Sequence, residues 1–470
     1  MRTPRLLLSL VLALACSVQA FAITAESESN NSESSADGPL VSGTTVNASI
    51  STTRDLDWYY FDVAAAGTIT VTLNHTSGRD FDFDLYRTTG SAVLTRATSQ
   101  RPETGSYSAP AAERYYIKVS RYSGTGSYTL NVTFPGSGSG GGGTTPPPPS
   151  NTRPSKPSDL TVYITGNSAD SSRQPVNGPA IVLMGGNFDI DETFVNRVYP
   201  IVNGGDVVVL RTSGTNGYND YLYNLRKDSL RPDSVETMIV NTRTKANSAY
   251  VKWVLDTAEF IYLAGGDQSD YLNFWAGTEV ETSMRAAYAR GAVLGGISAG
   301  CAVMGQFIYD PDGVTAATSA EAIANPYRSS MIISDTLLNA PVMANIITDT
   351  HFAQRDRMGR LMAFMARLRQ DGRASTIVGV GVDEDTALFI DRNRQAVVDG
   401  DFAVYILRED SQTARTRVTS GQSLIYTNVL RTKLTAGDTY NFSTNASNRS
   451  PIRLSVDGRN SQPYNPTNPY

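Results

Sequence analysis

The sequence predicts an α/β protein preceded by a smaller all-β domain. Between residues 41 and 134, short segments rich in β-branched and aromatic residues alternate polar and apolar side chains, which predicts a small β-sandwich. A Gly/Ser/Pro-rich segment at 135–157 predicts a linker. From residue 158 to 443, runs that are apolar on both faces alternate with amphipathic helical segments. That pattern predicts a mostly parallel sheet with helices on both faces.

The N-terminus predicts export. Arg2 and Arg5 precede a short apolar run and then small residues, which indicates a signal peptide at residues 1–22 and an extracellular or periplasmic destination. The apolar run is too short to span a bilayer. In an alternative interpretation, Cys16 is lipidated and anchors a lipoprotein. Residues 23–40 are polar and poor in aromatics, so we expect a flexible leader.

The small β domain has a recognisable order of strand motifs. We expect strands at 55–63, 67–75, 81–87, 114–120 and 126–134. The segments DLDWYYFDV, FDFDLYR, RYYIKVS and GSYTLNVTF resemble, in order, the strands of the bacterial pre-peptidase C-terminal domain. This resemblance implies a jelly-roll-like accessory module on a secreted hydrolase.

The larger domain contains the predicted parallel sheet. We expect strands at 179–186, 206–214, 236–241, 259–267, 291–298, 343–349 and 376–384, and helices at 279–291 and 355–372. Two later segments, 403–409 and 423–434, are expected to add an antiparallel edge. Residues 444–470 are polar and rich in Pro and Asn, which predicts a tail.

Composition excludes several function classes. The net charge is -5 and the isoelectric point about 5.3, which does not favour nucleic acid or an anionic membrane as partner. The larger domain has one histidine and one cysteine, so we expect no transition-metal site. Its glycine-rich segments lack the G-x-G-x-x-G and Gly-Lys-Ser patterns, and no cofactor is expected.

A candidate nucleophile lies in AVLGGISAGCAVMGQ. Gly296 to Gly300 form G-x-S-x-G at a junction between a strand and a helix. Small neighbours at a sharp turn leave the hydroxyl of Ser298 exposed above the sheet, as a nucleophile requires. The N–H of Ala299 would then face a developing oxyanion. On the motif alone, Ser298 could equally be a helix cap.

His351 is the candidate general base. It is the single histidine of the larger domain and follows a predicted strand, as Ser298 does. Active sites in parallel α/β sheets form at the carboxyl ends of strands. This placement favours catalysis over a structural histidine. A carboxylate-rich strand end, GVDEDTAL, comes later, and the order Ser…His…acid differs from that of α/β-hydrolases.

Four motifs together resemble those of cyanophycinases and aspartyl dipeptidases. GGISAGCAVM is similar to their GGTSAGAAVM, AGGDQSDYL to their GGDQ loop, DTHFAQRDRMGRL to DQHFSQRGRLGRL, and GVGVDEDTALFI to GIGIDEDTAL. The resemblance covers most of residues 180–443. It implies a flavodoxin-like fold akin to class I glutamine amidotransferases, and a serine exopeptidase that cuts β-aspartyl peptides. For the cyanophycinase branch the implied substrate is cyanophycin, a poly-aspartate chain with arginine on its β-carboxyls.

The resemblance also implies roles for individual residues. Ser298 is the nucleophile, His351 the base and Glu384 the acid that orients it. Only one of Asp383 and Glu384 should face the histidine, because neighbouring strand residues alternate faces. The carboxylates that could replace Glu384 are Asp310, Asp312 and Glu321. The oxyanion-hole candidates are the N–H groups of Gly266 and Ala299.

Further positions match the substrate pocket of the family. They are Gln268, Asp349, Arg355, Arg357 and Arg360. Arginines suit substrate carboxylates, and Asp349 could pair with a substrate guanidinium. Without the resemblance, three arginines on a helix form a solvated face, and Asp349 could simply cap that helix.

Three positions depart from the family pattern. Thr350 replaces glutamine, Ile297 replaces threonine and Cys301 replaces alanine. The first touches the expected pocket and puts the cyanophycin assignment in doubt. Cys301 lies inside the predicted helix, which favours core packing over a nucleophilic role.

Three hypotheses follow. The first is a secreted cyanophycinase that releases β-Asp-Arg dipeptides. The second is an exported β-aspartyl or isoaspartyl dipeptidase. The third is a non-catalytic binding protein, which the Ser298–His351 pair disfavours. Formation of a homodimer stays open.

Overall fold

The chain forms two compact units, residues 1–148 and 149–470, in this computed structural model. The structure describes residues 23, 25–43, 45–63, 66–75, 78–87, 92–135, 152–338 and 340–470. The predicted signal peptide, with Cys16, and linker residues 136–151 lie outside the described residues. Within the described part, no helix is long and apolar enough to cross a membrane.

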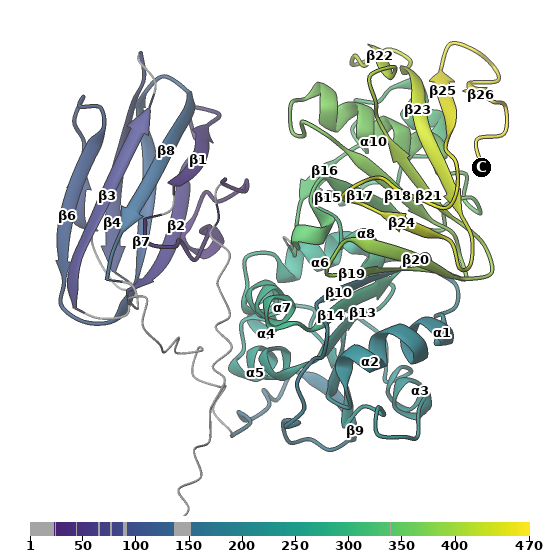
Figure 1. The fold of residues 1–470 in the computed structure, drawn as a ribbon, viewed down its shortest axis with the longest axis horizontal. Coiled ribbons are helices and arrows are strands. Elements are labelled where there is room, and N and C mark those ends of the chain that lie inside the picture. Colours follow the sequence, from purple (N-terminus) through teal and green to yellow (C-terminus); the bar gives the residue numbers. More distant parts are fainter. Residues whose placement is uncertain are drawn as a thin grey trace, which may run out of the picture. The chain divides into compact units, whose positions relative to one another are not determined.

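The first unit is a sandwich of two four-stranded antiparallel sheets, as predicted (Figure 1). Sheet A has the order β1-β8-β3-β6, with bounds Thr45–Ile50, Gly126–Thr133, Gly67–His75 and Glu103–Ala109. Sheet B has the order β2-β7-β4-β5, with bounds Asp57–Val63, Glu113–Ser123, Asp80–Arg87 and Ala92–Arg96. Alternate residues such as Phe61, Val71 and Phe83 are fully buried between the sheets. This alternation is the predicted period of two.

The expected flexible leader is instead attached to the sandwich. Ala25 pairs with Asn47, and Asp37 pairs with Tyr59, through isolated bridges on either side of the short 3-10 helix η1 (Glu33–Ser35). Leu40 is buried in the core of the sandwich. The low aromatic content suggested disorder, but backbone pairing to existing strands requires no aromatic side chain.

The second unit begins with a nine-stranded sheet of order β24-β20-β19-β10-β14-β13-β11-β12-β9. The strands β10, β14, β13, β11 and β12 are mutually parallel, and those on either side are antiparallel. The bounds are β9 Thr161–Gly166, β10 Ala180–Met184, β11 Asp206–Arg211, β12 Ser234–Ile239, β13 Phe260–Leu263, β14 Val293–Ile297, β19 Thr386–Asp391, β20 Gln395–Gly400 and β24 Thr439–Asn441.

Helices cover both faces of this parallel core, as predicted (Figure 1). Ile181 and Leu183 face one layer, whereas Val182 and Met184 face the other. The first layer contains α4 (Arg243–Ala246), α5 (Ala249–Thr257), α6 (Gln268–Trp275), α7 (Glu279–Arg290) and α8 (Ala299–Ala302). The second contains α1 (Asp191–Thr193), the π-helical η2 (Phe194–Val198), α2 (Tyr199–Val202) and α3 (Asn219–Asn224).

A second sheet corrects the prediction of a single, mostly parallel sheet. Its order is β16-β15-β17-β18-β21-β23-β25-β26, with β22 also paired to β23, and only β15, β17 and β18 are parallel. The bounds are β15 Phe307–Tyr309, β16 Ile333–Asp335, β17 Ile346–Asp349, β18 Val378–Val382, β21 Val404–Arg408, β22 Ala414–Arg417, β23 Ile425–Leu434, β25 Ile452–Asp457 and β26 Tyr464–Asn465. Helices α9 (Ser319–Ala324) and α10 (Met358–Gln370) pack on it, and the 3-10 helix η3 (Pro341–Met343) precedes β17. Most strands after β18 are joined by connections too short for a parallel crossover, so they pair antiparallel.

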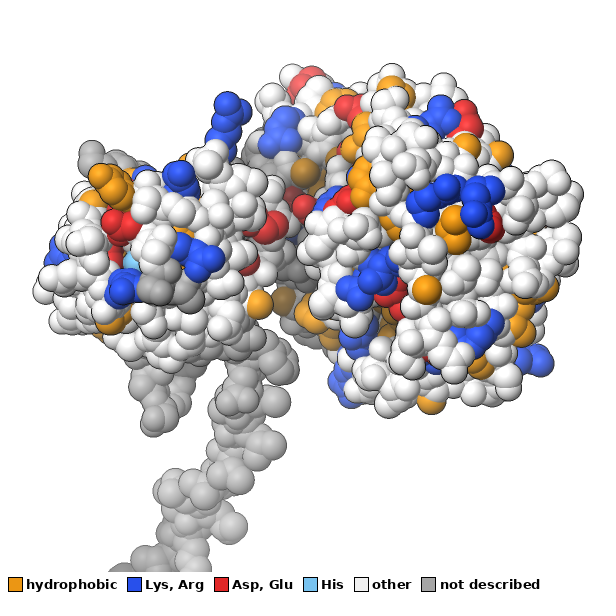
Figure 2. Space-filling model, turned by 90° about the horizontal axis from the view of Figure 1, so that it is seen from above, with side chains coloured by type: hydrophobic (Ala, Val, Ile, Leu, Met, Phe, Trp, Pro, Cys, Tyr) orange, Lys and Arg blue, Asp and Glu red, His pale blue; other side chains and the backbone are white. Residues whose placement is uncertain are grey.

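On the face drawn in Figure 2, basic and acidic side chains lie interspersed. This agrees with the sequence, which has 40 basic and 45 acidic residues.

The predicted polar tail after Ser443 is wrong for the part that forms β25. Leu454 and Val456 are fully buried there, and the Tyr470 ring packs against Phe352 and Tyr405. Two alternating apolar residues among polar ones suffice for a strand with one buried face, although the average composition of the segment hides them.

This packing predicts a position-specific stability effect. Leu454→Ala should lower the free energy of unfolding by about 2–5 kcal/mol, because it leaves a cavity in the core. Ile452→Ala, on the same strand but 38% exposed, should cost less than about 1 kcal/mol. Urea denaturation of both variants measures this. Equal, small effects would mean that the segment is a tail after all.

Candidate active site

Ser298 lies on a strained turn between β14 and α8. Its φ and ψ are 54° and -115°, a backbone conformation that non-glycine residues rarely adopt. A Cβ on Gly296 would lie 2.5 Å from the carbonyl carbon of Gly300, and one on Gly300 would lie 2.0 Å from the oxygen of Leu263. The two glycines of the motif therefore permit the sharp turn, and Ser298 is not an ordinary helix cap.

His351 reaches Ser298 from the end of β17, in the second sheet. Its Nε2 is 2.8 Å from Ser298 Oγ. The backbone N–H of His351 donates to Gly185, and the ring occupies the space where a side chain at Gly186 would be. A Cβ on Gly186 would be 2.1 Å from the ring. The absence of a side chain at Gly186, just after β10, therefore leaves the space that the imidazole fills.

Glu384 contacts the other nitrogen of the imidazole. Its Oε1 is 2.6 Å from His351 Nδ1. A carboxylate can only accept, so Nδ1–H donates to Glu384 and Nε2 is left to accept the Ser298 proton. The neighbouring Asp383 has a different task, because its carboxylate accepts from the backbone N–H groups of Ala353 and Ala403.

The other candidate acids lie elsewhere. Asp310 accepts from Ser334, and Asp312 accepts from Asn273. Glu321 closes a capping box with Thr318 at the start of α9. In the described residues, Glu384 is the carboxylate bonded to His351.

The expected oxyanion loop borders the serine. A Cβ on Gly265 would lie 3.6 Å from Ser298 Cβ, so the segment from β13 to α6 passes beside the hydroxyl. Gly266 comes next and is exposed, and Ala299 begins α8. Gln268 starts α6 and donates to the carbonyl of Tyr309 at 3.3 Å, which links this loop to the second sheet.

Asp349 does not lie open to substrate. Arg360 holds it with two hydrogen bonds, from Nε at 2.7 Å and from a terminal nitrogen at 2.6 Å. Both side chains are about 95% buried. Arg357 adds a third, longer contact at 3.4 Å. The expected pairing of Asp349 with a substrate guanidinium is therefore replaced by an internal ion pair that ties β17 to α10.

Two of the three arginines precede the helix, contrary to prediction. Helix α10 begins at Met358, and residues 351–356 form turns with positive φ at His351 and Asp356. Arg357 is the residue before the helix and is mostly buried, whereas Arg355 is 53% exposed. The predicted helix begins at residue 355, three residues before the observed start. Polar residues of a tight turn have no hydrophobic pattern that distinguishes them from the first turn of a helix.

The arginines give the site a positive potential. Arg357 and Arg360 share the carboxylate of Asp349. Burial and the positive charge of Arg360 lower the pKa of Arg357 to about 10. Arg355 lies 4.0 Å from Glu384. Burial and the charges of Arg355 and Arg357 lower the pKa of His351, whereas the hydrogen bond that His351 donates to Glu384 opposes this shift. The imidazole is therefore neutral near pH 7 and able to accept a proton.

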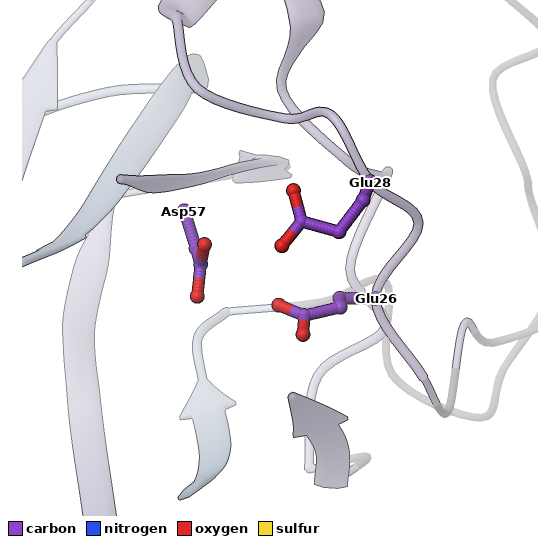
Figure 3. Close-up of side chains that lie close together, drawn as sticks. All are labelled: Glu26, Glu28 and Asp57. Carbon is purple, nitrogen blue, oxygen red and sulfur yellow. The ribbon is translucent and has the colours of Figure 1, made fainter. Parts of the chain in front are cut away.

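A separate acidic group in the sandwich was not anticipated from the sequence. Single carboxylate oxygens of Glu26, Glu28 and Asp57 lie within 4.8 Å of one another and face each other (Figure 3). Asp57 is fully buried, and its Oδ1 has no hydrogen-bond partner in the described structure. Oxygen ligands of this kind could hold a hard cation such as Ca²⁺. The signal was the ESES segment, which looked like a leader, together with the strand that begins DLD.

Comparisons with known proteins identify both units. Residues 55–121 match the bacterial pre-peptidase C-terminal domain, and residues 211–398 match peptidase family S51. The second unit contains a peptidase family S51 domain. Cyanophycinase from a Nostoc species is 29% identical over 216 residues, which covers 45% of this chain and 67% of the relative. Cyanophycinase from Geminocystis herdmanii is 29% identical over 184 residues, which covers 38% of this chain and 61% of the relative.

A solved peptidase from an acI-B1 Actinobacterium is also similar. It is 16% identical, has a TM-score of 0.39, and aligns with 57% of this chain and 99% of its own. The S51 match and the cyanophycinase relatives establish this chain as a serine-type peptidase, a hydrolase.

Within the S51 domain, Cys301 is fully buried in the core, and Thr350 accepts from Arg357 through its carbonyl at 2.8 Å.

The charges around His351 lead to a prediction about its pKa. Arg355→Gln should raise its pKa, because a positive charge that opposes protonation is removed. The two histidines of the chain give two imidazole signals for an NMR titration, and His75→Gln assigns them. Arg459→Gln, an exposed arginine paired to Asp457, is the matched control and should leave the His351 titration in place. A pKa of His351 that stays the same in Arg355→Gln would contradict this account.

The second prediction concerns the acidic group. Burial and repulsion from neighbouring carboxylates, Asp55 included, raise the pKa of Asp57 from 3.8 to about 9 and that of Glu28 from 4.5 to about 7. The folded sandwich therefore binds protons that the unfolded chain releases. The free energy of unfolding should fall as pH rises from the unfolded pKa of each group, 3.8 and 4.5, to its folded pKa of about 9 or about 7. Calorimetry with a chelator present should show this fall, and Asp57→Asn should reduce it. A transition independent of pH in both proteins would contradict the assignment.

Proposed function

We propose that this protein is an exported exopeptidase of the cyanophycinase type, which releases β-Asp-Arg dipeptides from cyanophycin. One observation carries the proposal: Ser298, His351 and Glu384 form a hydrogen-bonded chain inside a domain similar to cyanophycinases. Export is supported by the N-terminal sequence and by the pre-peptidase domain. The relatives named above are cyanophycinases, which supports this substrate over the dipeptidase alternative.

The proposed reaction follows from the proton positions. Ser298 Oγ attacks the scissile carbonyl carbon while its proton moves to His351 Nε2. Glu384 stabilises the imidazolium through Nδ1–H. The N–H groups of Gly266 and Ala299 stabilise the oxyanion. The imidazolium then gives its proton to the leaving amine, which leaves an acyl-enzyme. Water, deprotonated by His351, attacks the acyl carbon and releases Ser298.

The arginines divide the work of binding. Arg360 and Asp349 neutralise each other, so this buried pair holds the turn that carries His351. Arg357 shares the same carboxylate and brings an uncompensated positive charge beside His351. We therefore assign Arg357 to a substrate carboxylate, with exposed Arg355 as a second contact.

The experiment is hydrolysis of cyanophycin, with soluble products measured by mass spectrometry. Ser298→Ala should reduce the rate at least about a thousandfold, and Glu384→Gln about a hundredfold or more, because each interrupts proton transfer. Asp310→Asn is the matched control for the acid and should change the rate less than about twofold, since Asp310 binds Ser334.

The outcome separates the alternatives. Release of β-Asp-Arg that depends on Ser298 supports the proposal. Intact cyanophycin with Ser298-dependent cleavage of short isoaspartyl peptides would establish the dipeptidase instead. If Ser298→Ala changes no rate on any β-aspartyl substrate, the chain acts as a binding protein and the proposal fails.

A further inference from the structure

The two outer faces of the sandwich carry different side chains. On sheet A, the outward positions of β1, β3, β6 and β8 are small and uncharged. They are Thr45, Asn47, Ser49, Thr68, Thr70, Thr72, Asn74, Thr104, Ser106, Ser108, Ser127, Thr129, Asn131 and Thr133. On sheet B, the outward positions include one tryptophan and three tyrosines. The two sheets have the same strand number and architecture, so the rings of sheet B are not required by the sandwich fold itself.

The rings of sheet B form a continuous aromatic platform. Tyr60 lies opposite Tyr116 on the middle strand, and Tyr116 lies opposite Tyr86, so three tyrosines form one row across β2, β7 and β4. Trp58 stacks on Tyr86 with ring centroids 5.2 Å apart. All four rings are half-buried. We call Trp58, Tyr60, Tyr86 and Tyr116 the platform.

Cations of the chain already lie over two of these rings. The guanidinium carbon of Arg114 is 4.3 Å from the centroid of Tyr60, and this guanidinium also pairs with Asp62 at 2.8 Å. The ammonium of Lys118 is 5.5 Å from the centroid of Tyr86 and pairs with Asp84 at 2.7 Å. A cation held between a ring and a carboxylate is therefore the local binding mode on this face.

Two carboxylates on the same face have no cation of their own. Asp80 and Asp82 share the outward side of β4 with Asp84, and neither forms an ion pair or hydrogen bond in the described structure. Burial and the charges of Glu103, Asp80 and Asp84 raise the pKa of Asp82 to about 6. It is still ionised at pH 7, in a site that lacks a positive charge. Arg114 and Lys118, the basic side chains over the rings, are already paired, so the charges that remain unpaired beside the rings in the described part of the chain are the carboxylates of Asp80 and Asp82.

We propose that the platform, with Asp80 and Asp82, binds a polypeptide that presents several guanidinium groups. The guanidinium groups stack on Trp58 and Tyr116, whose rings carry no cation from the described residues, and pair with Asp80 and Asp82. Arginine suits this face better than lysine, because its planar group stacks on rings while donating to carboxylates. Each contact is weak, but a polymer with arginine on every repeat makes many at once. The polymer is cyanophycin itself, so this inference rests on the proposed function.

The test is retention of the full-length chain on cyanophycin granules. The Ser298→Ala background keeps the granules intact. Adding Trp58→Thr, Tyr116→Thr and Asp82→Asn should weaken granule binding about tenfold, since two ring contacts and one charge are lost. The matched control carries Thr72→Ser, Thr129→Ser and Asn131→Thr on sheet A and should bind as before. Circular dichroism and thermal unfolding check that both variants are folded.

A second measurement needs no platform variant. Polyarginine should displace the Ser298→Ala chain from granules at lower concentration than polylysine of equal length. Equal displacement by both, or unchanged binding by the folded platform variant, would overturn the proposal. Retention on an uncharged polysaccharide but not on granules would also overturn it and identify the platform as a sugar-binding face.

The two proposals fail in different ways. If the serine-intact chain cleaves soluble β-Asp-Arg repeats but the Ser298→Ala chain is not retained on granules, the platform assignment fails and the catalytic one stands. If granules bind through the platform but no Ser298-dependent hydrolysis occurs, the reverse holds.

Discussion

The active site depends on close backbone packing where strands of two sheets end. A Cβ on Gly185 would lie 1.8 Å from the carbonyl oxygen of Asp383, and the ring of His351 occupies the space beside Gly186. These contacts bring the first sheet, which carries Ser298, against the second, which carries His351 and Glu384. A side chain at either glycine would push the sheets apart and break a hydrogen-bonded chain whose links are 2.6 and 2.8 Å.

The buried pair of Asp349 and Arg360 secures the other side of His351. Burying one charge alone would be costly, so each requires its partner. The pair fixes the end of β17 to α10, between which the turn with His351 is held. Arg357 then contributes a positive charge that no side chain fully neutralises. Arg360 therefore has a structural role and Arg357 contributes charge to the site, although the two arginines look equivalent in the sequence.

The proposed platform would make the sandwich more than a spacer. Its core follows the alternating pattern of any small β domain, but its two outer faces differ in side chains and it holds a partly buried acidic group. Sheet A is covered with hydroxyl and amide groups, whereas sheet B carries rings and charges. An enzyme that acts on an insoluble polymer gains from holding it through many weak contacts, which leaves the catalytic site free to turn over. The peptidase and the accessory unit would then recognise the same arginine chemistry by different means.

The sequence by itself determined the two-domain organisation, the strands of the parallel core and the elbow at Ser298, because periodicity and glycine spacing are local signals. It also nominated His351, as the single histidine of its domain, and Glu384 through a motif. Tertiary structure decided what depends on how separate elements meet: the second sheet, the strand at Leu454, and the engagement of Asp349 on β17 by Arg360 on α10. Hydrogen bonds and ion pairs between different elements leave no periodic trace in the sequence. The same reason hid the meeting of Glu26 and Glu28 with Asp57.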